Sequence, residues 1–278
     1  MSTWILLRGL TREARHWGAL PDALRAALDD PKQGASAADA TPTRVLTIDL
    51  PGNGEHVSLR APSDVAGIVD FVREAAHASG APGPYCVLAM SLGGMVATCW
   101  AQRHPADIAR LVLINTSMRP FSRFDERLRP QAWPGLAQIA WHWSRAAAAE
   151  NVIHRLTCNN RETLDADLKQ WIAIRESAPV SRANALRQLL AAARFSAGRQ
   201  RPACETLVLS SRADGLVDPA CSAALAAAWH ADHWRHPWAG HDLPHDDPAW
   251  TVERIRAWFM DSLSGTGLEN ADSGLTDE

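Results

Sequence analysis

Ser91 is the first candidate for chemistry, because it stands between a short apolar run, residues 85–90, and a segment typical of a helix. A strand that turns directly into a helix leaves little room at the corner, so the residues two before and two after the turn must be small. Here they are Ala89 and Gly93. Such a nucleophile elbow, G-x-S-x-G with alanine at its first small position, strains the central residue and exposes its side chain. A serine that only caps a helix needs no small neighbours, so the pattern predicts Ser91 as a nucleophile.

A serine hydroxyl becomes nucleophilic when a base takes its proton and an acid orients that base. Asp214 lies in a loop directly after an apolar run, residues 206–210, and His241 lies in a loop after the last expected strand. If the strands are parallel, both loops lie at the same edge of the sheet as Ser91. The sequence therefore predicts a catalytic triad of Ser91, Asp214 and His241.

Each of the predicted partners of Ser91, the acid and the base, has alternative candidates. Asp218 precedes Pro219 and is typical of a helix N-cap, and it is the second candidate for the acid. Gly240 and the loop position favour His241 as the base over its neighbours His233, His236 and His245. These histidines show no spacing typical of metal ligands, so we expect no metal.

The oxyanion that forms during acyl transfer needs two fixed donors. We expect one to be the backbone N–H of Leu92, at the start of the helix after Ser91. The other is expected from the loop after the first strand, where Gly9 lets the backbone approach closely and offers the N–H of Leu10. His16 lies in the same loop and is either close to the pocket or structural.

The elements that would position these residues alternate along the chain. Apolar runs predict strands at 4–7, 45–50, 85–90, 108–114, 206–210 and 233–236. Helical spacing and helix-start signals predict helices near 20–28, 63–79, 92–104, 219–229 and 249–263, with a loop at 32–43. This alternation predicts an α/β fold, a mostly parallel sheet of about six strands flanked by helices.

Residues 118–199 interrupt the alternation with alanine, tryptophan and arginine at helical spacing. We therefore expect a discontinuous core, 1–117 and 200–263, an all-helical cap, 118–199, and a flexible acidic tail, 264–278. Acyl pockets are mostly apolar. The aromatic residues expected to bind substrate are Trp17, Phe121, Trp133, Trp141 and Trp143.

The expected cap is more basic than the rest of the chain. It holds thirteen lysines and arginines and seven acidic residues, a net charge of +6 in a chain whose formal net charge is −3. A basic lid over an acidic body would attract an anionic substrate or an acidic carrier protein. The arginines could equally be the solvated faces of cap helices.

Composition narrows the class of protein. A chain of 278 residues that is 46% hydrophobic and 21% charged fits one large α/β domain or two small ones. The net charge gives no reason to expect nucleic-acid binding, and no apolar run approaches the length of a membrane span. The N-terminus lacks a signal-peptide pattern, and five scattered cysteines suggest no disulfide framework. We expect a cytoplasmic protein.

Several of these segments together resemble an α/β-hydrolase of the carboxylesterase type: the loop from Gly9 to Trp17, Asp-Leu-Pro-Gly-Asn-Gly at 49–54, the elbow at 89–94, the Asp214 loop and Gly240-His241. The resemblance covers nearly everything outside 118–199 and the tail. The compact form with a helical cap is similar to the pimeloyl-acyl-carrier-protein methyl ester esterases of biotin synthesis. The chain departs from the family at Arg8, where members usually carry histidine, and at Ala89, where they carry glycine. Some relatives place the acid where this chain has Asn115.

The resemblance implies a serine hydrolase that cleaves a carboxylic ester or thioester through an acyl-enzyme and needs no cofactor. The narrower expectation is a methyl ester of an acyl chain borne by acyl carrier protein. The same triad could instead serve an acyltransferase or a cofactor-free perhydrolase. The chain could also be a non-catalytic binding protein on this scaffold, although its intact serine, aspartate and histidine argue against that.

Overall fold

The computed structural model describes residues 2–29 and 42–264. Within them, six parallel strands form one sheet in the order β2-β1-β3-β4-β5-β6. The strands are β1 (Thr3–Leu7), β2 (Arg44–Thr47), β3 (Tyr85–Met90), β4 (Ile108–Ile114), β5 (Glu205–Ser211) and β6 (Asp232–His236). The predicted α/β fold with a parallel sheet of about six strands is confirmed.

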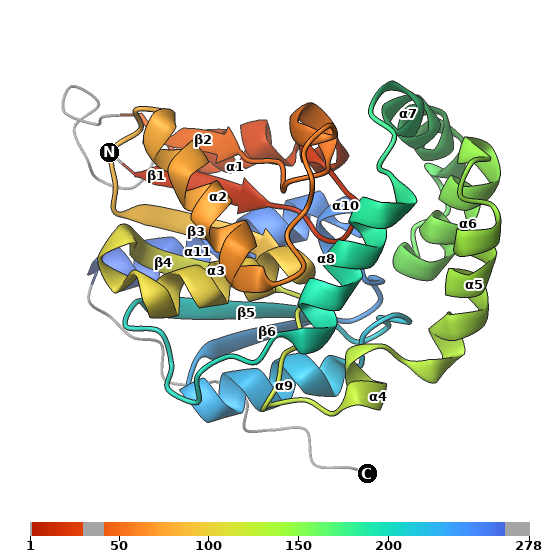
Figure 1. Ribbon diagram of the computed structural model, residues 1–278. Coiled ribbons are helices and arrows are strands. Elements are labelled where there is room, and N and C mark those ends of the chain that lie inside the picture. Colours follow the sequence, from red (N-terminus) through yellow and green to blue (C-terminus); the bar gives the residue numbers. More distant parts are fainter. Residues whose placement is uncertain (1, 30–41, 265–278) are drawn as a thin grey trace, which may run out of the picture.

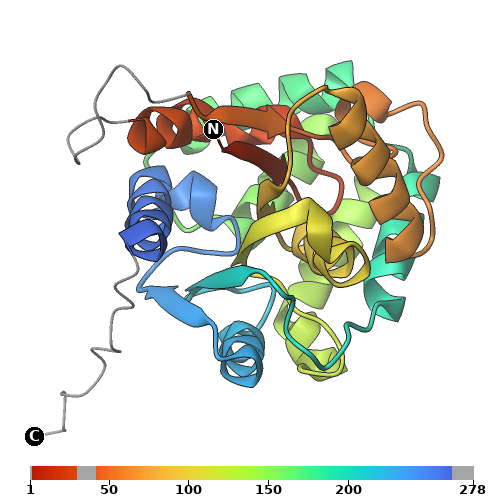
Figure 2. The same cartoon turned by 90° about the vertical axis from the view of Figure 1, so that its left-hand side faces the viewer.

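Helices cover both faces of the sheet (Figures 1 and 2), as the apolar runs of its central strands require. One face packs against α2 (Val65–Ala78), α3 (Leu92–Arg103) and α9 (Pro219–Trp229). The other packs against α1 (Leu20–Leu28) and α11 (Pro248–Ser264). Side chains alternate between these two apolar layers along each strand, so that Ile5 joins the first layer and Leu6 the second.

A helical insertion follows β4 and lies beyond the carboxyl ends of the strands (Figure 1). It contains α4 (Phe124–Arg127), α5 (Trp133–Trp141), α6 (Ala146–Thr157), α7 (Leu164–Ser177) and α8 (Arg182–Arg194). The chain leaves and re-enters the core at one place, where the amide of Ala197 donates to the carbonyl of Arg119 at 2.8 Å. The predicted helical insertion is confirmed, and we call its helices the cap.

Some boundaries differ from the sequence prediction. Strand β2 ends at Thr47, not at residue 50. The buried carboxylate of Asp49 accepts the amides of Ala14 at 2.6 Å and Glu55 at 3.0 Å, which draws this segment out of the sheet and toward the loop after β1. A short helix, α10 (Leu243–Asp246), was not predicted. The expected loop at 32–43 and tail at 264–278 lie almost wholly outside the described residues.

The described helices include none with both the length and the apolar character needed to cross a membrane.

Close packing between α3 and the end of β1 brings the loop after β1 against the turn that carries Ser91. A Cβ atom built on Gly93 would lie 2.5 Å from the carbonyl oxygen of Leu7 and 2.6 Å from that of Arg8. These are backbone atoms, so a larger residue would push the helix away from the strand. The small residue expected two positions after Ser91 is therefore a structural requirement.

Candidate active site

Ser91 occupies the strained position that the elbow pattern predicts, with φ 54° and ψ −119°. Its backbone is fully held: the amide donates to the carbonyl of Ile114 at 3.0 Å, and its carbonyl accepts from the Thr116 hydroxyl at 2.8 Å. The side chain makes no helix-capping hydrogen bond. It remains half-buried while its neighbours in the chain are buried. Backbone strain is thus used to present this hydroxyl.

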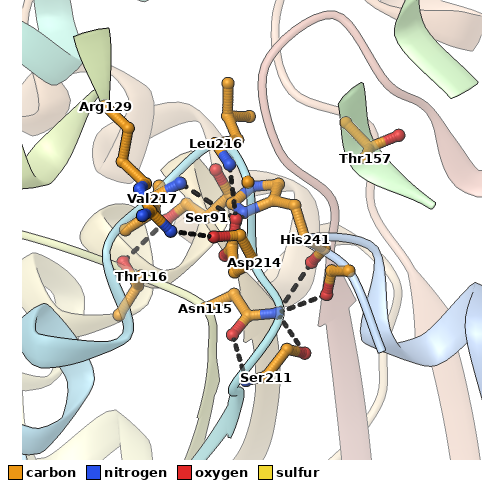
Figure 3. Close-up of polar contacts among 12 residues, drawn as sticks. Ser91, Asn115, Thr116, Arg129, Thr157, Ser211, Asp214, Leu216, Val217 and His241 are labelled. Carbon is orange, nitrogen blue, oxygen red and sulfur yellow. Dashed lines mark hydrogen bonds and ion pairs between the residues drawn. The ribbon is translucent and has the colours of Figure 1, made fainter. Parts of the chain in front are cut away.

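His241 and Asp214 meet at the carboxyl end of the sheet (Figure 3). The Nδ1 atom of His241 lies 2.7 Å from Oδ2 of Asp214. The other carboxylate oxygen accepts the amides of Leu216 at 2.8 Å and Val217 at 2.9 Å. These bonds fix the carboxylate and orient the imidazole, which is the acid–base arrangement that a serine nucleophile needs.

The charge state of His241 is set by two opposing effects. Burial of the imidazole favours its neutral form, but the charge of Asp214 and the hydrogen bond to it prevail and raise the pKa of His241 above its usual value. Asp242 adds to this rise, and Arg8 opposes it. An imidazole poised in this way can accept a proton from a hydroxyl and return it.

Asn115 positions the histidine loop. Its side-chain amide donates to the carbonyl of His241 at 2.8 Å and to that of Gly240 at 3.3 Å, and its carbonyl accepts the amide of Ser211 at 2.9 Å. The next residue, Thr116, holds the carbonyl of Ser91. Residues 115 and 116 therefore connect the serine and the histidine, although the described residues show no hydrogen bond between the two side chains.

The loop after β1 passes directly over Ser91. A Cβ atom built on Gly9 would lie 3.0 Å from Cβ and 3.5 Å from Oγ of Ser91. The next amide, that of Leu10, and the amide of Leu92 donate to no protein acceptor among the described residues. Two free donors beside a serine are the arrangement expected of an oxyanion hole.

Arg8, the departure from the family pattern, forms a buried ion pair. Its guanidinium donates to both carboxylate oxygens of Asp242, and the two side chains are each 3% exposed. The guanidinium also lies over the ring of Trp17, 4.7 Å from its centroid. Burial alone would raise the pKa of Asp242, but the charge and hydrogen bonds of Arg8 lower it. The pair joins the loop over Ser91 to the residue after His241.

The sequence profile of the alpha/beta hydrolase family matches residues 4–254, which is most of the chain. The chain belongs to the alpha/beta hydrolase family.

Curated relatives within the family match only in part. A pimeloyl-[acyl-carrier protein] methyl ester esterase of Chromobacterium violaceum is 31% identical over 182 residues, which are 65% of this chain and 62% of that protein. The biotin biosynthesis bifunctional protein BioHC of Teredinibacter turnerae is 30% identical over 116 residues, 42% of this chain and 17% of that protein. The chain spans less than two thirds of the length of these relatives.

Solved structures confirm the alpha/beta hydrolase fold. An esterase from Exiguobacterium antarcticum superposes with a TM-score of 0.72 at 13% identity, over 94% of this chain and 92% of that one. A putative non-heme bromoperoxidase from Mycobacterium tuberculosis gives a TM-score of 0.67 at 18% identity, over 96% and 94%.

The competing candidates for the acid and the base make other contacts. The carboxylate of Asp218 caps α9 by accepting the amide of Ala220 at 2.9 Å. His233 bonds to the Ser210 hydroxyl at 2.8 Å, and His236 bonds to Asp247 at 3.1 Å. His245 contacts Asp167 and is considered further below, and His16 is buried, with Nδ1 accepting the amide of Glu13 at 3.1 Å.

The aromatic residues expected to bind substrate lie in separate environments. Trp17 is buried and lines a cleft of about 650 Å³ beside α1 and α11, whose lining does not include Ser91. Phe121 packs edge-on against Trp229 in the core. Trp133 and Trp141 are 45% and 82% exposed, and Trp143 lies under the guanidinium of Arg175. Their contact with substrate stays a prediction.

The buried pair of Arg8 and Asp242 yields a stability prediction. Arg8→Met would leave the carboxylate of Asp242 buried without a partner, so we expect it to lower the free energy of unfolding by about 3–5 kcal/mol. The double variant Arg8→Met/Asp242→Leu removes both charges and should recover most of that loss. Urea unfolding at neutral pH measures both, and a double variant as unstable as the single one would contradict this account.

Proposed function

We propose that this chain is a carboxylic ester hydrolase that works through an acyl-enzyme. The observation that carries the proposal is the 2.7 Å contact between His241 and Asp214 beside a serine held at positive φ. Oγ of Ser91 attacks the ester carbonyl while its proton passes to Nε2 of His241. The alcohol leaves with that proton, and water, activated by the same imidazole, then releases the acid and restores the serine.

The charge on the carbonyl oxygen would be stabilised by the free amides of Leu10 and Leu92. Removing one such donor typically costs about 10²–10³ in kcat. Both belong to the backbone, so their placement depends on the packing of α3 against β1 and not on any side chain that faces the substrate.

A covalent probe tests the assignment of the nucleophile. A fluorophosphonate should label the wild-type chain at Ser91, and Ser91→Ala should lose both this label and the hydrolysis of a p-nitrophenyl ester. Ser196→Ala, a matched change at an exposed serine, should keep both. Labelling that persists in Ser91→Ala would exclude this nucleophile.

The pH dependence of kcat/KM tests the assignment of Asp214 as the acid that orients His241. Because Asp214 raises the pKa of His241, kcat/KM of the wild type should fall on acidification with a midpoint above the usual histidine value, about 6.5. In Asp214→Asn, burial still lowers the pKa of His241, but the carboxylate charge that raises it is gone. The midpoint should therefore move to lower pH, and kcat should fall about 10⁴-fold.

The control for this variant is Asp218→Asn, since asparagine still caps a helix. We expect it to leave both kcat and the midpoint close to the wild-type values. If Asp218→Asn moved the midpoint and Asp214→Asn did not, the roles assigned to the two carboxylates would be reversed.

For the substrate, we propose a methyl ester of an acyl chain carried by an acidic acyl carrier protein. The similarity to the Chromobacterium violaceum esterase supports this, as does the charge of the cap. Several cap cations serve the fold: Arg127 donates to the carbonyl of Ala192 at 2.6 Å and Arg129 to that of Asp214 at 2.7 Å. Others are exposed, among them Arg123, whose side chain is 78% exposed, and Arg194.

Reversing the charge of exposed cap arginines tests whether the cap recognises the carrier protein. The double variant Arg123→Glu/Arg194→Glu should raise KM for a carrier-bound ester severalfold and leave KM for a small neutral ester unchanged, since attraction between opposite charges assists only the acidic partner. Arg25→Glu/Arg201→Glu, exposed positions outside the cap, is the control and should change neither. Equal effects on both esters would exclude carrier recognition by these residues.

A further inference from the structure

Three residues with metal-binding side chains meet in a buried cluster where the cap contacts the core. His154 lies in the last turn of α6, and Cys158, four residues later, is the C-cap of that helix; they are 0% and 1% exposed. His245 approaches them from α10. One donor atom from each of the three residues lies within 4.8 Å of the others. Imidazole nitrogen and cysteine sulfur are the ligands that zinc prefers in proteins.

A carboxylate completes the cluster. Oδ2 of Asp167, on α7, lies 3.2 Å from Nε2 of His154 and 2.9 Å from Nε2 of His245, and it accepts the Thr163 hydroxyl at 2.7 Å. Both rings therefore converge on one oxygen. Carboxylates in this position orient metal-binding imidazoles or bind the ion themselves, and they supply negative charge.

Apolar side chains cover one side of the cluster. The ring of Trp171 packs against His154, with centroids 5.2 Å apart, and against His245 at 4.9 Å. Cys158, Trp171 and Ile174 form a small apolar core of their own. On this side the packing limits the access of water and strengthens the attraction between an ion and its ligands.

We propose that His154, Cys158 and His245, with Asp167 as the fourth ligand, bind a divalent transition metal ion of the zinc class. The thiol of Cys158 releases its proton to solvent as the bond between sulfur and metal forms. The ion joins α6 and α7 of the cap to His245 of α10, which lies four residues beyond His241. The site is independent of the proposed hydrolysis, and it revises the expectation, drawn from sequence spacing, that no metal is bound.

Arg161 competes with a metal ion for His154. Its guanidinium donates to Nδ1 of His154 at 3.1 Å. A metal on Nδ1 would take that lone pair, and a metal on Nε2 would move the ring proton to Nδ1, so the arginine loses its acceptor in either case. Arg161→Gln removes the guanidinium with its positive charge and shortens the side chain, and it should therefore tighten metal binding.

Cobalt(II) chloride, titrated into the reduced full-length chain, is the probe, because a cobalt–thiolate bond produces a charge-transfer absorption. The wild type should bind one cobalt ion with this absorption and gain thermal stability, and zinc should displace the cobalt. Cys158→Ser should lose the absorption, and Cys99→Ser should keep it. His245→Gln should weaken binding at least tenfold, whereas His77→Gln, an exposed control, should not.

The variants also distinguish misfolding from lost binding. Circular dichroism and thermal melting without metal report whether each variant folds, and Arg161→Gln retains every ligand and is expected to bind more tightly than the wild type. No cobalt–thiolate absorption in the wild type would overturn the proposal, as would absorption that survives in Cys158→Ser. Binding to Arg161→Gln that is no tighter than to the wild type would also overturn it.

Discussion

The candidate site depends on the absence of space between Gly93 and the end of β1. Because α3 begins against the carbonyls of Leu7 and Arg8, the chain that follows β1 must cross directly over Ser91. This crossing brings the amides of Leu10 and Leu92 to the same side chain. The positive φ of Ser91 belongs to the same turn, in which the strand enters the helix directly while both backbone groups of the serine are hydrogen-bonded.

Buried arginines make the second set of connections. Arg8 pairs with Asp242, and Arg12 pairs with Glu150 of the cap at 2.7 Å. Arg175 donates to the other oxygen of Glu150 at 3.0 Å, so that this carboxylate, 1% exposed, has two cationic partners. Charges at such depth are tolerated when they are paired and hydrogen-bonded. The cap arginines are therefore not all solvated faces of helices: Arg175 pairs with a buried carboxylate inside the cap, and Arg129 bonds to the Asp214 carbonyl of the core.

The sequence predicted six strands alternating with helices, the helical insertion and the elbow, because each leaves a local signal of spacing or small residues. The contact of Asp214 with His241 followed from topology, since parallel strands end at one edge. The sequence could not predict the partner of Arg8, which lies 234 positions away, or the role of Asn115, whose bonds reach the end of β5 and the loop of His241. The pair His154 and Cys158 had a visible four-residue spacing, but its meaning emerges only when α10 brings His245 against it.

These connections couple the cap to the proposed oxyanion donors. The loop that carries Leu10 also carries Thr11, whose amide bonds to Gln188 of α8 at 3.0 Å, and Arg12, which reaches Glu150 of α6. Gln188 in turn donates to Asn53 at 2.8 Å, and Asn53 donates to the carbonyl of Arg12. Two cap helices therefore contact a single short loop. A displacement of α6 or α8 breaks those bonds or moves the loop, so the position of the cap and the position of the proposed oxyanion donors do not vary independently.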